Sequence, residues 1–389
     1  MRRMEWPIQP VEIQRRFVPR FCPRRACDRH HIGRRDRFAF RRVGSYCRAD
    51  GRRVPRYRCL SCGKTFSKQA FSLTYFSKRP ELIEPVAAGL VAGGAHRQIA
   101  RSVDCAPSSV TRLAAKLGRH ALLLQLLLLL HLRHHDEETV LDHAEAFEGS
   151  QDDPFAVATL VGRDSWFIYG LEGCTHARTG RRSSPQEARR ALRPSRDARG
   201  GYRGSAARLM ALKLRFGPED RPLRIVCDDK KDYAQAARLP HLRDRVRLRV
   251  YPNPERGPKG SPRSATARAR DQAMFPNDLL HALVRHSLAH HHRETIAFPR
   301  RINAGMERLF LFTAWRNLVK GVSERKPDPT TPAMRVGLTR TPWSWARVLA
   351  RRLFPDRLPL PDSWVELYRR AWTTPSLPHN TRHNLKLAF

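Results

Sequence analysis

Two short apolar runs that each end in an aspartate decide the fold of this chain: Thr139-Val140-Leu141-Asp142 and Leu223-Arg224-Ile225-Val226-Cys227-Asp228. Apolar, β-branched runs of this length predict buried strands. Ligands usually lie beyond strand ends, so acids placed there can converge from distant parts of the chain. We therefore expect Asp142 and Asp228 to face a common site at the edge of a sheet.

Further strands and helices surround these two runs. The pattern predicts strands at 155–161, 166–171 and 246–251, a helix near 205–216, and mostly helical structure from about Pro276 onward. The stretch 251–270 is rich in Pro and basic residues and predicts a loop. This alternation indicates an α/β core over 139–320, followed by a C-terminal helical extension and tail over 321–389.

Four cysteines in two pairs predict a structural zinc site. Cys22-x4-Cys27 and Cys59-x2-Cys62 flank a short strand-rich segment, so residues 21–76 form a small zinc-binding module. His30, His31 or Cys47 are alternatives to Cys27 as the fourth ligand. Cys47, Cys105, Cys174 and Cys227 are scattered, which fits ordinary thiols in a reducing compartment.

Residues 80–132 have the pattern of a helix-turn-helix DNA-binding domain with a leucine-rich helix. One helix is expected at 96–103, a turn at 104–106, and a second helix from Pro107, the favoured first helical position. The apolar residues of these helices are spaced so that they face inward. The polar and basic residues of the second helix then face outward, as a recognition helix requires: Ser108, Ser109, Thr111, Arg112 and Lys116. The alternative is a helical hairpin that packs only on its neighbours. The run Leu122–Leu130 suits a core helix or a dimer-forming helix.

The charge of the chain indicates a polyanionic partner. Its 389 residues carry 74 Lys and Arg against 36 Asp and Glu, a net charge of +38. Such an excess is typical of nucleic-acid binding. The longest apolar stretch is too short to span a bilayer, and no signal peptide is expected at the charged start. We expect a cytoplasmic protein on the bacterial nucleoid, with no membrane partner.

With these features the chain resembles DDE-type insertion-sequence transposases, close to the insertion-sequence-one-like group. The resemblance rests on segments for the zinc knuckle, the helix-turn-helix and three acid blocks: YRCLSCGKTFSKQAFS, HRQIARSVDCAPSSVTRLAAKLG, LDHAEAFEGS, IVCDDKKDY and RRINAGMERLFLFTAWRN. It implies an RNase H-like catalytic core preceded by a zinc-ribbon-like module. It also implies a catalytic triad of Asp142, Asp228 and Glu307 that holds Mg²⁺ or Mn²⁺, and DNA strand transfer at element ends by a homodimer or higher oligomer.

Carboxylates suit this chemistry, because two Mg²⁺ ions that activate the attacking oxygen and stabilise the leaving oxygen prefer hard oxygen ligands. The identity of each acid has alternatives. Asp229 adjoins Asp228 and could be the second acid, and Glu294 is an alternative to Glu307 as the third. Glu145 and Glu148 lie close in sequence to the first acid, Asp142. The block after Asp228 also lacks the Gly, Glu or His common in the group, so an inactive copy is an alternative.

Two other function classes compete with a transposase. A DNA-binding regulator would use only the zinc module and the helix-turn-helix, and would not need three acids. An RNA-associated basic protein would have no use for a large acid-bearing core. The His-rich stretch from His281 to His292 is read as a basic, solvated helix face rather than a metal site.

Overall fold

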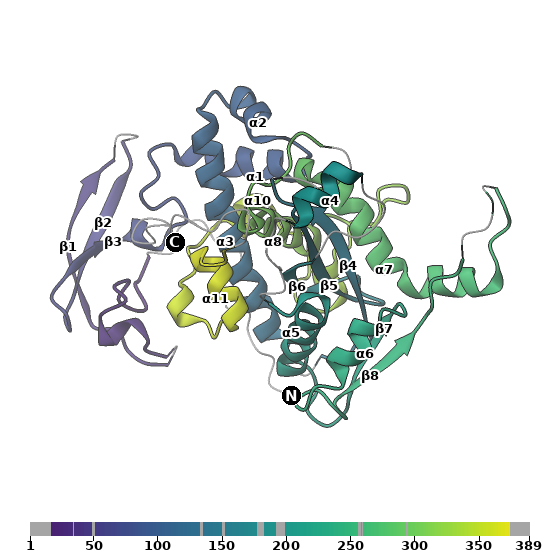
Figure 1. The fold of residues 1–389 in the computed structure, drawn as a ribbon. Coiled ribbons are helices and arrows are strands. Elements are labelled where there is room, and N and C mark those ends of the chain that lie inside the picture. The colour runs from purple at the N-terminus through teal and green to yellow at the C-terminus, as the bar shows by residue number, and fades with distance from the viewer. Residues whose placement is uncertain are drawn as a thin grey trace.

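The computed structural model describes residues 17–33, 35–48, 51–132, 135–149, 152–176, 183–191, 199–255, 258, 260–292 and 295–373. They form a mixed α/β protein with a small N-terminal sheet and a larger central sheet (Figure 1). The basic lead expected over residues 1–20 and the frayed last residues fall mostly or wholly outside the described ranges.

The N-terminal sheet contains β1 (Phe40–Cys47), β2 (Arg53–Cys59) and β3 (Thr65–Ser67), all antiparallel. Its apolar side is a small aromatic cluster around Tyr57 and Phe66. Two 3-10 turns flank the sheet, η1 (Asp28–His30) and η2 (Lys68–Phe71). The sequence predicts strands at 43–46, 54–58 and 65–67; all three are confirmed, and β1 and β2 extend beyond the predicted bounds.

Three helices follow, after the 3-10 turn η3 (Pro80–Leu82): α1 (Ile83–Val91), α2 (His96–Ser102) and α3 (Pro107–His131). By length and composition α3 alone among the described helices could cross a membrane, but 83% of its most apolar window is buried inside the protein. It packs along α8 (Ile302–Leu318). The leucine-rich run is therefore a core helix.

The central sheet has the order β6-β5-β4-β7-β8: β4 (Thr139–Phe147), β5 (Pro154–Gly162), β6 (Ile168–Thr175), β7 (Leu223–Cys227) and β8 (Val246–Val250). The first three strands are antiparallel, whereas β7 runs parallel to both β4 and β8. Every residue of β5 and β6 is buried, as expected for strands covered on both faces.

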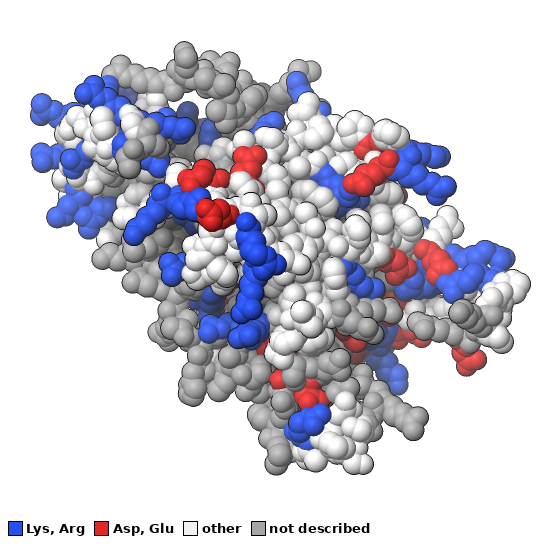
Figure 2. Space-filling model, turned by 90° about the horizontal axis from the view of Figure 1, so that it is seen from above, with Lys and Arg blue, Asp and Glu red and all other residues white. Residues whose placement is uncertain are grey.

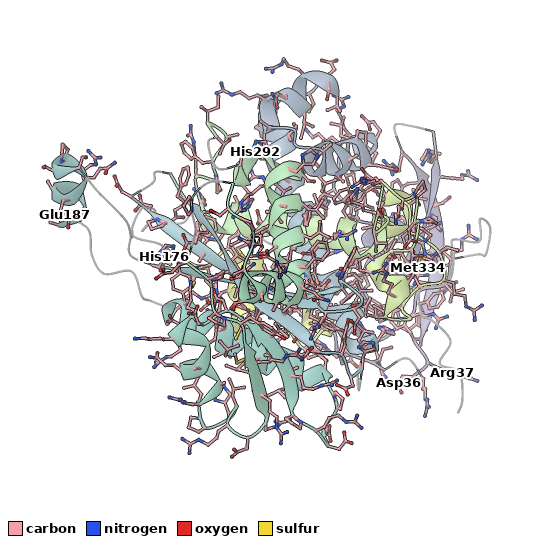
Figure 3. All side chains as sticks on the ribbon, turned by 90° about the vertical axis from the view of Figure 1, so that its right-hand side faces the viewer. Asp36, Arg37, His176, Glu187, His292 and Met334 are labelled. Carbon is pink, nitrogen blue, oxygen red and sulfur yellow. The ribbon has the colours of Figure 1, made fainter. Side chains whose placement is uncertain are left out.

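Helices cover both faces of this sheet. On one face lie α5 (Gly201–Phe216) and α6 (Lys231–Ala237), which contact the buried His143 of β4. On the other face lie α7 (Ala265–Ser287) and α8. The predicted loop over 251–270 is shorter than expected, because Ser264 caps α7 by accepting from the N–H of Ala267. A short helix, α4 (Ser184–Ala191), stands away from the body and carries Glu187 (Figure 3).

The C-terminal segment returns to the N-terminal sheet. After η4 (Ala289–His291) and α8 come α9 (Pro332–Arg335), α10 (Trp345–Val348), η5 (Pro355–Arg357) and α11 (Asp362–Arg369). Figure 1 shows α11 between the β1–β3 sheet and α3. Arg357 donates to the carbonyls of His30 and Ile32, and its guanidinium lies 3.9 Å from the ring centre of Phe21. The end of the chain thus fixes the N-terminal module against the core.

Candidate functional site

Four cysteines converge beside the N-terminal sheet. The Sγ atoms of Cys22, Cys27, Cys59 and Cys62 all lie within 4.8 Å of one another. Two of the separations, Cys22–Cys62 and Cys27–Cys59, are 3.9 Å. A tetrahedron of Zn–S bonds of about 2.3 Å has edges of about 3.8 Å. The predicted cysteine cluster is confirmed, and its geometry can hold a structural zinc ion.

Burial makes two of these four thiols, those of Cys22 and Cys27, poor anions on their own. It raises the pKa of Cys27 to about 11, and it also raises the pKa of Cys22. A divalent cation reverses this preference, because thiolates are the metal-binding form. His30, an alternative ligand in the sequence, instead points Nδ1 at the carbonyl of Cys22, 2.8 Å away. Cys47, another alternative, is exposed on β1.

Asp142 and Asp228 lie level with each other on neighbouring parallel strands. The register pairs Thr139 with Ile225 and Val140 with Val226, so continuing it by two residues brings Asp142 beside Asp228. Asp228 follows the last residue of β7, whereas Asp142 sits inside β4, which continues to Phe147. The sequence predicted that each aspartate ends a strand. This holds for Asp228, whereas Asp142 lies in the middle of its strand.

The two aspartates interact electrostatically. The pKa of Asp142 is raised to about 6, mainly by burial and also by the negative charges of Asp228 and Asp278. The backbone N–H of His143 donates to Asp142 Oδ1 at 2.7 Å and opposes that rise. Desolvation and like charge together make an acid cluster that favours a bound cation.

Asp278 on α7 is the third acid of this cluster. Its carboxylate binds Arg270, whose Nη1 lies 2.5 Å from Oδ2. Arg270 also donates through Nε to Asn253, and Asn253 donates to Asp228 Oδ2 at 3.0 Å. The chain Asp228–Asn253–Arg270–Asp278 therefore links two acids through one cation. Arg270 also lowers the pKa of Asp142, so its positive charge acts on that carboxylate as well.

Buried polar contacts fix α7 over the sheet. Asn277 donates to the carbonyl of Val140 at 2.9 Å, and Thr159 of β5 lies 3.0 Å from both Asn277 Oδ1 and His281 Nε2. The other ring nitrogen of His281 is 3.7 Å from Asp142 Oδ2. Burial lowers the pKa of His281 to about 3, so the ring is neutral. These contacts set where Asp278 stands relative to Asp142.

The structure corrects the interpretation of the His-rich stretch. His281 is buried beside the acid cluster, and burial lowers the pKa of His290 to about 2 and of His291 to about 4. Charge on these three rings is disfavoured, so they do not belong to a basic solvated face, whereas His286 and His292 are exposed as that interpretation expects. Neither Asp278 nor Asn277 was expected from the sequence. The signal was available: Asn277 and His281 are four residues apart, on one helix face, with Asp278 between them.

Glu307, the predicted third acid, is placed elsewhere. Both of its oxygens accept from Arg370, at 2.6 and 2.5 Å, and its Cβ lies against Gly118 of α3. Met306 and Leu309 occupy the face of α8 that meets the central sheet. Because residues one or two positions away on a helix point elsewhere, Glu307 faces α3 and not the sheet. The structure therefore does not bring Glu307 to Asp142 and Asp228.

The remaining acids considered from the sequence have other surroundings. Asp229 is exposed, and Tyr202 donates to Glu145 at 2.7 Å. Glu148 accepts from the N–H of Ile302 at the start of α8, which is a capping role. Glu294 lies outside the described residues. None of the three described acids joins Asp142 in its hydrogen bonds or ion pairs within the described chain.

The helix-turn-helix residues divide into two groups. Ser108, Thr111 and Arg112 are exposed and Ser109 is partly buried, as a DNA-facing helix requires. Lys116 is a correction: its ammonium is buried and donates to the carbonyl of Tyr75 at 3.1 Å. Thr111 Oγ1 lies 2.9 Å from His96 Nδ1, which ties the start of α3 to α2.

Positive charge gathers on the N-terminal module. Figure 2 shows Lys and Arg at the left end of the molecule, the end that β1–β3 occupy in Figure 1. Exposed arginines cover β1 and β2 and the turn between them: Arg41, Arg42, Arg52, Arg53, Arg56 and Arg58. This sheet is suited to a polyanion.

The aspartate cluster has the donor set that Mg²⁺ prefers, but its carboxylates are spread more widely than the thiols. Within the described chain, the four cysteines are the one group of at least three such ligands whose atoms lie within 4.8 Å. Arg270 binds Asp278 instead, and it reaches Asp228 only through Asn253. Oxygen ligands of this kind are the donors that a divalent metal such as Mg²⁺ prefers.

Comparison with known proteins gives no family assignment: no protein-family model matches the chain, and no curated protein is similar to it.

Proposed function

We propose that this chain is a transposase that cuts and joins DNA, with an RNase H-like core in which Asp142, Asp228 and Asp278 carry the chemistry. The observation that supports this proposal is the level placement of Asp142 and Asp228 on parallel central strands, with Asp278 on α7 near enough for its charge to raise the pKa of Asp142. The strand order β6-β5-β4-β7-β8 is compatible with such a core. Asp278 replaces Glu307 as the third acid of the proposal.

The three carboxylates would hold Mg²⁺ or Mn²⁺. Bound there, the metals supply activation of the attacking oxygen and stabilisation of the leaving oxygen. The protein supplies the positioning: His281 and Asn277 hold α7, and the N–H of His143 orients Asp142. Arg270, which binds Asp278 in the structure, would be a suitable partner for a DNA phosphate, because a guanidinium binds phosphate well.

DNA binding would be divided between the exposed start of α3 and the basic N-terminal sheet. Arg112 is the one charged residue among the exposed candidates on α3, and the arginines of β1 and β2 supply phosphate contacts. Element ends and target DNA are the proposed partners of a homodimer or higher oligomer. A cytoplasmic location on the nucleoid belongs to the same proposal.

The test is cleavage and joining of duplex DNA with Mg²⁺ or Mn²⁺. Asp142→Asn, Asp228→Asn and Asp278→Asn should each abolish both steps and keep DNA binding, because the acids work as one unit. Asp229→Asn is the matched control, since Asp229 adjoins Asp228 but is exposed, and it should remain active. If Asp278→Asn is active while Glu307→Gln is inactive at unchanged stability, the third acid is Glu307 and not Asp278.

The regulator is the second candidate, and a specific observation favours it. The three carboxylates do not converge as tightly as the thiols, and Arg270 already compensates part of their charge. A protein that binds DNA yet shows no metal-dependent cleavage on any end sequence would support this alternative. The same experiment therefore separates the two functions.

A further inference from the structure

A groove lies between the N-terminal module and the C-terminal segment. Its volume is about 880 Å³, and its walls come from the first cysteine loop, the turn before α1, and α11 with the segment that precedes it. Figure 1 shows α11 beside the β1–β3 sheet. The groove is remote in sequence from Asp142, Asp228 and Asp278, and none of the three lines it.

The mouth of the groove carries an aromatic residue in a strained conformation. Phe76 has a φ of 56° and is 61% exposed. A bulky side chain with a positive φ is a true outlier, and strain of this kind clusters where ligands are held. The strain is imposed from outside the turn: Lys116 of α3 donates to the carbonyl of Tyr75 and to Ser77 Oγ, at 3.1 and 3.4 Å.

Other rings and cations continue along the walls. The rings of Tyr75 and Phe76 are 4.2 Å apart, and the Arg352 guanidinium lies 4.5 Å from the ring centre of Phe354. Arg24 and Arg369 are exposed on opposite walls. One acid, Asp356, lines the groove, and it is paired with Arg25 at 3.3 Å. The lining thus combines cations and aromatic rings with aliphatic side chains such as Leu358, Leu360 and Val365.

Two buried lining residues carry polar atoms to which the described residues offer no hydrogen bond. They are His30 Nε2 and Tyr368 Oη, on side chains that are 1% and 3% exposed. Buried polar atoms are almost always satisfied by protein, water or ligand. These atoms add a polar component to the aromatic, cationic and aliphatic lining.

We propose that this groove binds an unpaired stretch of DNA, with a base stacked on Phe76 and phosphates held by Arg24 and Arg369. Aromatic platforms beside a cationic track are how proteins hold single strands, since every base offers a face for stacking. A paired base within a duplex has its faces covered by its neighbours, so it cannot stack on Phe76. The inference rests on the proposed function only in taking DNA as the polymer.

The test is the affinity of the full chain for a single-stranded oligonucleotide that carries 2-aminopurine, measured by fluorescence quenching without Mg²⁺. Phe76→Gly removes the ring and suits the positive φ, so the fold is retained. It should weaken single-strand binding about 5- to 150-fold, since stacking contributes about 1–3 kcal/mol per base. It should leave duplex binding unchanged. Phe76→Trp should restore both quenching and affinity.

Phe275→Ala is the matched control, because Phe275 is also an exposed phenylalanine, at 46%, but lies on α7. It should bind the single strand as the unaltered protein does. No quenching by the unaltered protein, or equal binding by Phe76→Gly, would overturn the proposal. An equal loss on single-stranded and duplex DNA would also overturn it. Failure of cleavage alone would not affect this assay, because no Mg²⁺ is present.

Discussion

Glu307 and Arg370 form a two-point ion pair in the interior of the protein. Arg370 Nε and Nη2 donate to the two carboxylate oxygens at 2.6 and 2.5 Å, and the Glu307 and Arg370 side chains are 7% and 12% exposed. The pair joins α8 to the residue that ends α11, where Arg370 has a φ of 52°. This contact attaches the C-terminal segment to the core, and it explains why an acid precedes Arg308 at this point of the sequence.

Glu307→Gln should destabilise the protein without a specific effect on DNA chemistry. Removing one partner of a buried pair leaves an uncompensated charge on Arg370 and costs about 3–5 kcal/mol. The free energy of unfolding, from denaturant titration, measures this loss. Glu366→Gln on α11 is the control, since Glu366 is 52% exposed, and it should change stability by less than about 0.5 kcal/mol. Full stability in Glu307→Gln would contradict this structural role.

The raised pKa of Asp142 predicts a pH-dependent stability in the absence of Mg²⁺. Its pKa is 3.8 in the unfolded chain and about 6 in the folded protein, so folding favours the protonated form. The stabilisation is complete below about pH 4 and is lost as the pH rises through 6. Between pH 5 and 8 the free energy of unfolding of the unaltered protein should fall by about 1–1.5 kcal/mol, and that of Asp142→Asn should not show this fall.

The measurement for Asp142 is the unfolding free energy of both proteins at the two pH values, repeated with Mg²⁺. A bound cation should remove the loss of unfolding free energy that the unaltered protein shows at pH 8. Asp271→Asn is the control, because Asp271 is a partly exposed acid on α7 whose ion pair with Arg263 is at the surface. Identical pH profiles for Asp142→Asn and the unaltered protein would show that Asp142 carries no raised pKa.

Cys59→Ser should release the metal and unfold the N-terminal module while the central sheet stays folded. Structural zinc contributes roughly 10–16 kcal/mol to the folding of small modules. Zinc content and limited proteolysis of residues 17–76 measure the effect. Cys47→Ser is the matched control, because Cys47 is exposed and should leave the metal in place. Full metal content in a Cys59→Ser, Cys62→Ser protein would exclude the four-cysteine site.

Arg112→Ala should reduce discrimination between end and random DNA by about 1–3 kcal/mol if Arg112 contacts a base edge. Binding should also fall about 10³–10⁵-fold between roughly 50 and 200 mM salt, as for several phosphate contacts. Lys116→Ala is the comparison: its ammonium is buried, so the substitution should lower stability and leave sequence preference unchanged. Unchanged preference in Arg112→Ala would assign recognition to another surface, such as the basic N-terminal sheet.

The sequence alone determined what depends on local pattern. Paired cysteines at zinc spacing, strands at 54–58 and 223–227, and the helix that begins at Pro107 need only neighbouring residues to be recognised, and each is present. Asp142 and Asp228 were found for the same reason, since each follows an apolar run.

Only the tertiary structure shows what surrounds each acid on the helices. A helix shows its own periodicity in sequence but not which face meets the sheet, so the sequence favoured Glu307, with Glu294 as its rival, and did not indicate Asp278. Long-range contacts determine which face of each helix meets the sheet. They are the contact of Asn277 with the carbonyl of Val140 and that of Glu307 with Arg370. The same limit applies to Lys116, which helical spacing assigned to the outward face and whose partner, the carbonyl of Tyr75, lies 41 residues away.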